Sequence, residues 1–271
     1  MAESKPTIPN IPSDLSKYRI PTLPPSFHYI PNFLTEHEEA QILQKIPSQR
    51  WTHLTKRRLQ AHPSTLTKTN TLIASPLPTY LATSPPVLKR FEALHVFEGT
   101  RHGAPNHVLI NEYRPGEGIM PHEDGDAYSP VVATVSLGGC LCLELTVHPS
   151  RVKEDGVGAA AEAQAEVKGQ RGEGGVVNGE VKNRWRILQE PRSLLVTTGE
   201  AYVALLHGIE PVERDEGLSK ETVVNWELLP DDTKARVEEA GGVNERSTRI
   251  SLTYRDVLKV SKIGLGIMGR R

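Results

Sequence analysis

One short stretch of the sequence combines residue types that could hold a catalytic metal ion. Residues 107–113 read as a strand, and the Pro- and Gly-containing loop at 115–118 ends it. After this loop come His122 and Asp124, which project from one face of an extended backbone because they are two positions apart. An imidazole and a carboxylate on one face can supply two ligands to a metal ion.

The third ligand must come from another part of the chain. His207 ends the apolar run 202–206, where a histidine needs a polar partner. Two histidines and one carboxylate form the facial triad of non-haem Fe(II) oxygenases, which leaves positions open for a co-substrate and O2. The His-x-Asp tripeptide alone is common by chance, and a solvated histidine in a turn is its alternative interpretation.

A second polar group lies on a strand near the carboxyl end. Alternation along residues 249–255 puts four side chains on one face: Arg249, Ser251, Thr253 and Arg255. A guanidinium suits a carboxylate because it offers two parallel donors. The alternative for such an arginine is an ordinary salt bridge on a strand. Asn111 and Tyr113 likewise share a face just upstream of the His-x-Asp pair.

Composition limits the class of protein. The chain has 271 residues, 37% of them apolar, with 22 Gly and 21 Pro, which predicts a real core interrupted by long polar insertions. A net charge of −1 does not indicate a generally basic nucleic-acid binder. Cys140 and Cys142 are too close to bridge without distortion, so we expect buried thiols in a reduced protein of the nucleus and cytoplasm.

The chain divides into an arm, one domain and a tail. We expect a proline-rich extended arm at 1–31, a single domain at 32–260 and a tail at 261–271. Thr35 and Glu38 have the spacing of a capping box, which predicts a helix that Pro47 ends. A second helix is expected at about 84–94. No apolar run reaches the ~18 residues that a membrane span needs, so no membrane contact is expected. We also predict a monomer.

Short strands separated by tight turns dominate the rest of the domain. The apolar and alternating runs predict strands at 107–113, 131–137, 141–147, 185–189, 193–198, 202–207 and 249–255. This pattern predicts a mainly β fold, a double-stranded β-helix or jelly-roll core with the two helices packed on one side.

Two insertions interrupt the predicted core. Residues 150–183 are rich in Gly, Ala, Glu and Val without aromatic residues, and we expect them to be disordered. Residues 213–246 are acidic and contain Trp226, which is expected either in a short helix or as a cap on the barrel. Neither insertion carries a pattern typical of catalysis.

A basic segment precedes the core. Residues 40–91 contain eight Lys and Arg residues and no Asp or Glu. The cluster Lys56, Arg57 and Arg58 lies among Trp51, His53 and His62, and basic side chains beside flat rings suit phosphates and bases. A solvated basic face is the equally weighted alternative.

Taken together, these motifs resemble the AlkB-like Fe(II)- and 2-oxoglutarate-dependent dioxygenases. The resemblance covers about residues 28–258 without the insertions, and NEYRPGEGIMPHEDG, LLHGI and RISLTYR are most similar to the sixth homologue subgroup. It implies that Fe(2+) is held by His122, Asp124 and His207, with 2-oxoglutarate and O2 as co-substrates.

The resemblance also implies roles for the remaining polar residues. Arg249 would hold the distal carboxylate of 2-oxoglutarate, with Asn111, Tyr113 and Ser251 as hydrogen-bond donors. Arg255 is similar to the second arginine of the family's strand. The family's base-reading lid corresponds to residues 51–70, so the implied substrate contacts in this segment are Lys56, Arg57 and Arg58. Asp126 is similar to an acid that approaches the substrate base in some relatives, and a solvated loop aspartate is its alternative.

The resemblance implies oxidative demethylation or hydroxylation of nucleic acid, either RNA or DNA, single-stranded or modified. Three alternatives stay open: a nucleic-acid-binding relative with little turnover, a protein hydroxylase on the same barrel, and a metal-binding jelly roll without oxygen chemistry. The basic segment argues against the second alternative. The third alternative leaves the polar face of residues 249–255 unexplained, which argues against it.

Overall fold

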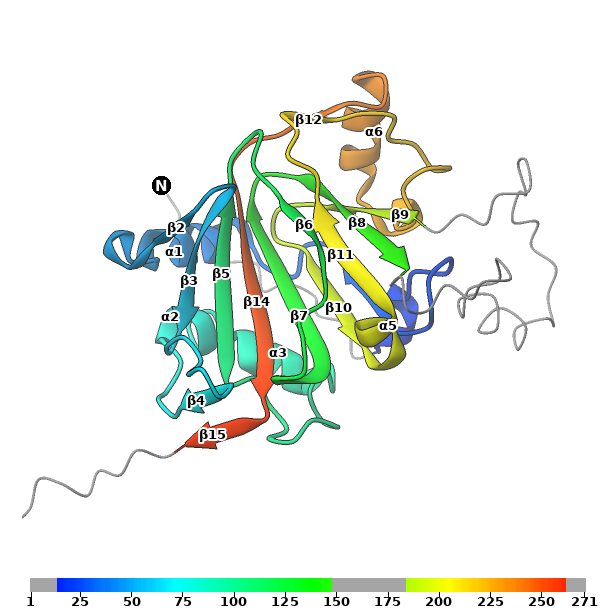
Figure 1. The fold of residues 1–271 in the computed structure, drawn as a ribbon. Coiled ribbons are helices and arrows are strands. Elements are labelled where there is room, and N and C mark those ends of the chain that lie inside the picture. Colours follow the sequence, from blue (N-terminus) through cyan, green and yellow to red (C-terminus); the bar gives the residue numbers. More distant parts are fainter. Residues whose placement is uncertain (1–13, 148–183, 262–271) are drawn as a thin grey trace, which may run out of the picture.

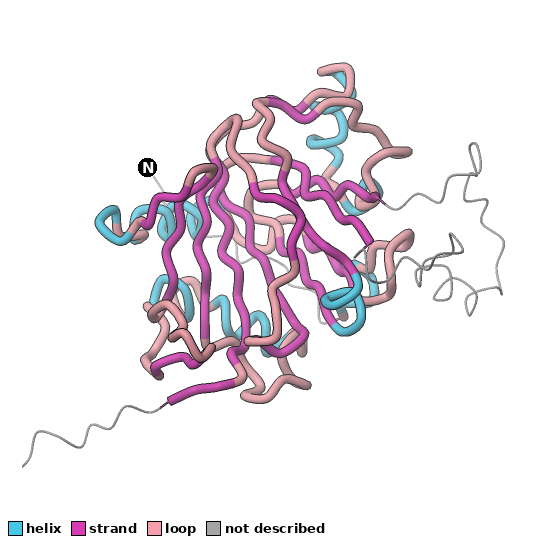
Figure 2. The backbone as a smooth tube through the Cα atoms, in the orientation of Figure 1, coloured by secondary structure: helices cyan, strands magenta, loops and turns pink. Residues whose placement is uncertain are grey.

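The computed structural model describes residues 14–147 and 184–261, in which two antiparallel sheets form a jelly-roll sandwich (Figures 1 and 2). The larger sheet contains, in spatial order, β1 (Phe27–Ile30), β10 (Leu194–Thr198), β7 (Tyr128–Gly138), β14 (Arg249–Val257), β5 (His107–Tyr113), β3 (Arg57–His62) and β2 (Thr52–Leu54). The smaller sheet contains β6 (Ile119–His122), β11 (Leu205–Ile209), β8 (Leu141–Val147) and β9 (Arg184–Gln189). The predicted mainly β, jelly-roll fold is confirmed.

Helices cover the outer face of the larger sheet, as predicted for one side of the core. They are α1 (Glu36–Lys45), α2 (Thr79–Ala82) and α3 (Val87–Ala93) (Figure 1). The capping box is present, because Thr35 Oγ1 accepts from the Glu38 amide at 3.2 Å and the Glu38 carboxylate accepts from the Thr35 amide at 2.9 Å. No helix of the described residues is long and apolar enough to cross a membrane.

Strand β14 separates the apolar cluster beneath the helices from the cavity between the two sheets. Leu252 and Tyr254 are fully buried in the cluster that contacts the helices. Residues in the alternate positions line a cavity between the two sheets: Arg249, Ser251, Thr253 and Arg255. The predicted common face of these four side chains is confirmed, because side chains alternate along a strand.

The predicted strand at 202–207 is wrong in its first half. Residues Gly199–Ala204 form helix α5, and β11 begins only at Leu205. A short apolar run fits a buried helix as well as a strand, and the backbone of Gly199 has a φ of 58°, which suits a turn into α5. The helix brings Ala201 and Tyr202 to the wall of the cavity.

The proline-rich arm is shorter than predicted. Within its described part, residues 15–18 form a 3-10 helix and β1 pairs with β10. Phe27 and Tyr29 on β1 are buried, as are Ile20 and Leu23 before it, so the core includes this part of the predicted arm. Residues 1–13, the predicted disordered insertion 150–183 and residues 262–271 of the tail lie outside the described residues. At the tail's beginning, β15 (Lys259–Ser261) pairs with β4 (Thr71–Ile73).

The acidic insertion 213–246 is folded against the barrel. It contains β12 (Arg214–Asp215), a 3-10 turn at Trp226–Leu228, α6 (Asp231–Glu239) and β13 (Asn244–Glu245). Trp226 is buried in the same cluster as the smaller sheet, which favours its interpretation as a cap. A short helix was expected around Trp226, but α6 begins only at Asp231.

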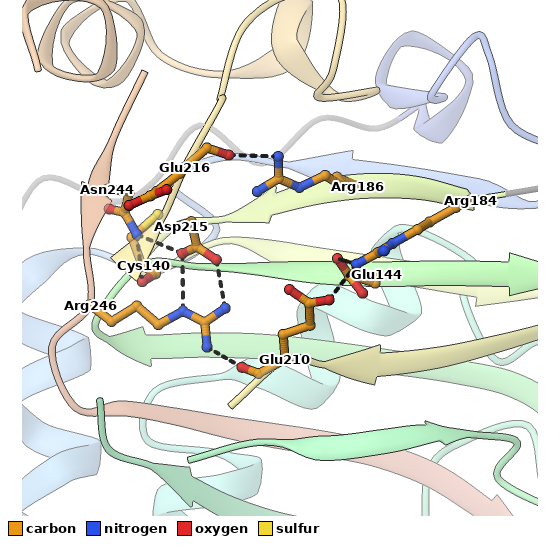
Figure 3. Close-up of polar contacts among 9 residues, drawn as sticks. All are labelled: Cys140, Glu144, Arg184, Arg186, Glu210, Asp215, Glu216, Asn244 and Arg246. Atoms are coloured by element: carbon orange, nitrogen blue, oxygen red, sulfur yellow. Dashed lines mark hydrogen bonds and ion pairs between the residues drawn. The ribbon is translucent and has the colours of Figure 1, made fainter. Parts of the chain in front are cut away.

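A buried ion pair fastens this insertion to the strands on either side (Figure 3). Arg246 donates to both carboxylate oxygens of Asp215, at 3.1 and 2.6 Å, and to the carbonyl of Glu210 at 2.6 Å. Asn244 bridges Asp215 and the carbonyl of Cys140. Since Glu210 follows β11 and Arg246 precedes β14, the ends of these two strands are held together.

The insertion also covers an edge of the smaller sheet. Strand β9 is at that edge, where its outer backbone groups would lack partners. The side chain of Asn225 accepts from the Leu188 amide and donates to the Leu188 carbonyl, both at 2.9 Å. Asn225 is fully buried, so its carboxamide replaces a neighbouring strand at this position.

We predict that Asn225→Ala lowers the free energy of unfolding by roughly 2–4 kcal/mol, because two buried backbone groups lose their partners. Urea unfolding followed by circular dichroism measures the change. Glu227→Ala, an exposed change in the same turn, is the matched control and should change stability little. Equal stability of the two variants would contradict the role assigned to Asn225.

Candidate metal centre and co-substrate cavity

Two strands of the smaller sheet bring the candidate histidine ligands together. His207 on β11 is the direct register partner of His122 on β6, and their ring centroids are 4.3 Å apart. The strands can approach this closely because Gly208 lies beside Pro121. A Cβ at position 208 would be 2.9 Å from the Pro121 nitrogen. Neighbours far apart in the sequence thus become adjacent in the sheet.

Asp124 completes the group in the loop after β6. One ligand atom from each of His122, Asp124 and His207 lies within 4.8 Å of the others. The backbone turns away at Gly125, whose φ is 85°. Among the described residues this is the one group of three potential ligand side chains that meets such a distance limit.

The hydrogen bonds of these side chains and the burial of His207 fit a divalent metal ion. The Nδ1 atom of His122 is 2.9 Å from the carbonyl oxygen of Met120, which only accepts, so Nδ1 is the donor in this contact and Nε2 is left as the candidate ligand atom. Burial lowers the pKa of His207 to about 4, so this imidazole is neutral, as a metal ligand must be. Arg255 donates a hydrogen bond to one carboxylate oxygen of Asp124.

A cavity of about 270 Å³ extends from these ligands into the barrel. At its far end lies Arg249, which is 2% exposed. Its guanidinium donates to Ser136 Oγ at 3.1 and 2.8 Å and to Gln189. None of the ion pairs found among the described residues includes Arg249, and burial lowers its pKa to about 10. A buried guanidinium without a carboxylate partner is costly, so it suits an anion that enters the cavity.

Register places the other predicted co-substrate residues beside this arginine. Tyr113 is the cross-strand partner of Arg249, and Asn111 is the partner of Ser251. All four residues line the cavity. They form a row of donors from the deep end toward the ligands, which is suited to an elongated carboxylate.

Arg255 occupies the metal end of the same strand. It bonds to Asp124, and its guanidinium lies 4.8 Å from the ring centroid of Tyr128. The second arginine of the predicted co-substrate strand therefore holds a candidate metal ligand in place. Tyr202 also supports this loop, because its hydroxyl donates to the Gly125 carbonyl at 3.2 Å.

Sequence reasoning missed Ser136, Gln189 and Tyr202. Ser136 is the register partner of Ser251 on β7, so alternation along a correctly paired β7 could have indicated it. The contact between Gln189 and Arg249 joins the two sheets and has no local signal. Tyr202 was hidden because its segment was predicted to be a strand.

The basic cluster divides between two faces of the β2–β3 hairpin. Lys56 is exposed at its tip, and Arg57 lines the cavity. Arg58 faces the other way, where it pairs with Glu112 at 2.6 Å and lies 4.4 Å from the Trp51 ring centroid. Asp126 is exposed and is not among the residues that line the cavity.

Several basic side chains of residues 40–91 already have partners within the protein, so fewer of them can bind phosphate than the charge of this segment suggested. Arg90 pairs with Glu38 at 2.5 Å, and Arg50 contacts His62 and two backbone carbonyls. Of the predicted substrate contacts, Lys56 and Arg57 remain at the mouth of the cavity. They border an apolar groove of about 780 Å³, the entrance groove, which includes Leu54, Met120 and Pro121 and shares His122 with the cavity.

We predict that His207→Ala abolishes stabilisation by Co(II), a redox-stable probe of the site. A ligand that binds only the folded state stabilises it by about 2.7 kcal/mol at a concentration of 100 Kd, so the wild-type melting temperature should rise with Co(II). His37→Ala, an exposed histidine on α1, is the control and should respond as the wild type does. A Co(II) response preserved in His207→Ala would contradict the ligand assignment.

Comparison with known proteins agrees with this geometry. The model of the 2OG-Fe(II) oxygenase superfamily matches residues 26–255. "Probable RNA/DNA demethylase ALKBH6" of Danio rerio is 36% identical over 255 residues, which cover 93% of this chain and 94% of that protein. "Uncharacterized protein L905" of Acanthamoeba polyphaga mimivirus is 26% identical over 236 residues, covering 86% and 85% of the two chains. The chain belongs to the AlkB-like Fe(II)- and 2-oxoglutarate-dependent oxygenases of this superfamily.

Proposed function

We propose that this dioxygenase removes methyl groups from nucleic acid by oxidation. The observation that carries the proposal is the cavity itself, which joins a His-Asp-His group to a buried guanidinium without a carboxylate partner among the described residues. The relative from Danio rerio, whose printed name is RNA/DNA demethylase, supports nucleic acid as the substrate class.

The proposed ligands are His122, Asp124 and His207. When bound, Fe(II) supplies O2 activation: one oxygen atom goes to 2-oxoglutarate, giving succinate and CO2, and the other converts a substrate C–H bond into C–OH. A hydroxymethyl group on nitrogen then breaks its N–C bond and leaves as formaldehyde. The residues of the chain hold, orient and shield these reactants.

Arg249 determines how 2-oxoglutarate lies in the cavity. Its guanidinium is fixed by Ser136 and Gln189, so the remaining donor capacity points in one orientation for the distal carboxylate. Tyr113 and Ser251 lie beside it and supply hydroxyl donors. The 2-oxo acid end then reaches the His122–Asp124–His207 group.

The substrate approaches along the entrance groove. Its apolar surface suits an unpaired base, and Lys56 at the tip of the hairpin suits a phosphate. Arg58 is assigned a structural role because Glu112 and Trp51 already occupy its guanidinium. A groove that opens beside His122 supports a single-stranded or flipped-out nucleotide, since a base within a duplex cannot reach such a site.

Formaldehyde release from a panel of methylated RNA and DNA oligonucleotides tests the proposal. We expect the wild-type protein with Fe(II) and 2-oxoglutarate to release formaldehyde and succinate in equal amounts from at least one oligonucleotide. His122→Ala should lose both products and keep its circular dichroism spectrum. Succinate formed by this variant at the wild-type rate would refute the ligand assignment. If the wild-type protein forms succinate but none of the oligonucleotides yields formaldehyde, demethylation is refuted.

We predict that Lys56→Glu weakens oligonucleotide binding and reduces the slope of log affinity against log salt by about 1, because one phosphate contact is lost. Fluorescence anisotropy at several salt concentrations measures both quantities. Lys45→Glu on α1 makes the same charge change away from the groove and is the control. An equal effect of the two variants would show that only total charge matters.

A further inference from the structure

Arg57 is the residue through which the β2–β3 hairpin reaches the co-substrate cavity. It lines both the cavity and the entrance groove. Its Nε donates to the carboxamide oxygen of Asn111 at 3.2 Å. Asn111 is 7% exposed and lies among the residues proposed to surround 2-oxoglutarate.

This contact fixes the orientation of the Asn111 carboxamide, which belongs to a residue that lines the cavity. A guanidinium has five N–H donors and no acceptor, so only the oxygen of Asn111 can face it. The NH2 group, which has two donors, must then point away from Arg57. A donor turned toward the cavity attracts a carboxylate or a 2-oxo oxygen, whereas a carboxamide oxygen in the same place would repel it.

Nothing else among the described contacts of Asn111 sets this orientation. The hydrogen bonds found among the described residues include one to the Asn111 side chain, and Arg57 donates it. A terminal carboxamide rotates easily between two orientations that differ mainly in the placement of oxygen and nitrogen. Removing the guanidinium would therefore leave both orientations accessible.

The hairpin holds Arg57 firmly enough for this task. The carbonyl of Lys56 accepts from the Gly118 amide at 3.0 Å, which fixes the tip to the loop before β6. Leu59 on β3 is the register partner of Asn111, so Arg57, two residues earlier on β3, is the diagonal neighbour of Asn111. The long side chain of Arg57 reaches across this diagonal to the Asn111 carboxamide.

We propose that Arg57 is a positioning residue for 2-oxoglutarate, acting through the carboxamide of Asn111. The inference rests on the placement of 2-oxoglutarate given under the proposed function. It separates Arg57 from Lys56: the exposed lysine serves the nucleic acid, and the half-buried arginine serves the co-substrate.

Isothermal titration of 2-oxoglutarate into the anaerobic Fe(II)-loaded protein tests this role without turnover. We expect Arg57→Ala to raise the Kd for 2-oxoglutarate about 10-fold, the effect of one hydrogen bond to a charged group. Arg57→Lys keeps a donor near the Asn111 oxygen and should restore part of the affinity. In steady-state assays, the KM for 2-oxoglutarate should rise while kcat at saturation stays near that of the wild type.

A double-mutant cycle distinguishes positioning from general loosening. Asn111→Ala and Arg57→Ala/Asn111→Ala should have the same Kd, because Arg57 has no further effect once the carboxamide is gone. Arg58→Ala removes the same side chain from the opposite face of the hairpin and should leave the Kd unchanged.

Three results would overturn the inference: an unchanged Kd in Arg57→Ala, additive effects in the cycle, or an equal loss in Arg58→Ala. Each of these leaves the proposed function intact, because the wild-type protein still binds 2-oxoglutarate. If the Fe(II)-loaded wild type itself fails to bind 2-oxoglutarate, the proposed function fails, and the inference fails with it.

Discussion

The register between β6 and β11 is the constraint on which the rest of the site depends. It sets His122 directly opposite His207, so a sheet contact becomes a pair of metal ligands. A slip of one residue would turn one of the two imidazoles to the other face of the sheet. The close approach of Gly208 to Pro121 resists such a slip, since no larger side chain fits at 208.

The same pairing logic builds the other end of the cavity. Strand β14 lies between β7 and β5, so each polar residue on its inner face has a neighbour on both sides. On the β7 side, Ser136 accepts hydrogen bonds from Arg249, and on the β5 side Tyr113 is the register partner of Arg249. The outer face of β14 contributes Leu252 and Tyr254 to the core beneath the helices. One strand therefore supplies binding groups and stability through alternate residues.

Local patterns predicted the parts of the protein whose partners are close in sequence or repeat with a fixed period. The capping box of Thr35 and Glu38 and the polar face of β14 are examples. The β2–β3 hairpin was not predicted, because a run of three basic residues is typical of a solvated patch. The partners of Arg58 and Arg90 come from elsewhere in the fold, at Glu112 and Glu38. Charge counted along the sequence therefore overestimated the surface free for phosphate.

The pairing of β8 with β9 also bears on how the strand that carries His207 is held. Thr146 and Arg184 are register partners, so the strand ends that flank the long connection already lie side by side. The pairing itself therefore holds these two ends, and β8 in turn pairs with β11 on its other side. The place of His207 in the sheet is thus set by hydrogen bonds between described strands, whatever the chain does between Thr146 and Arg184.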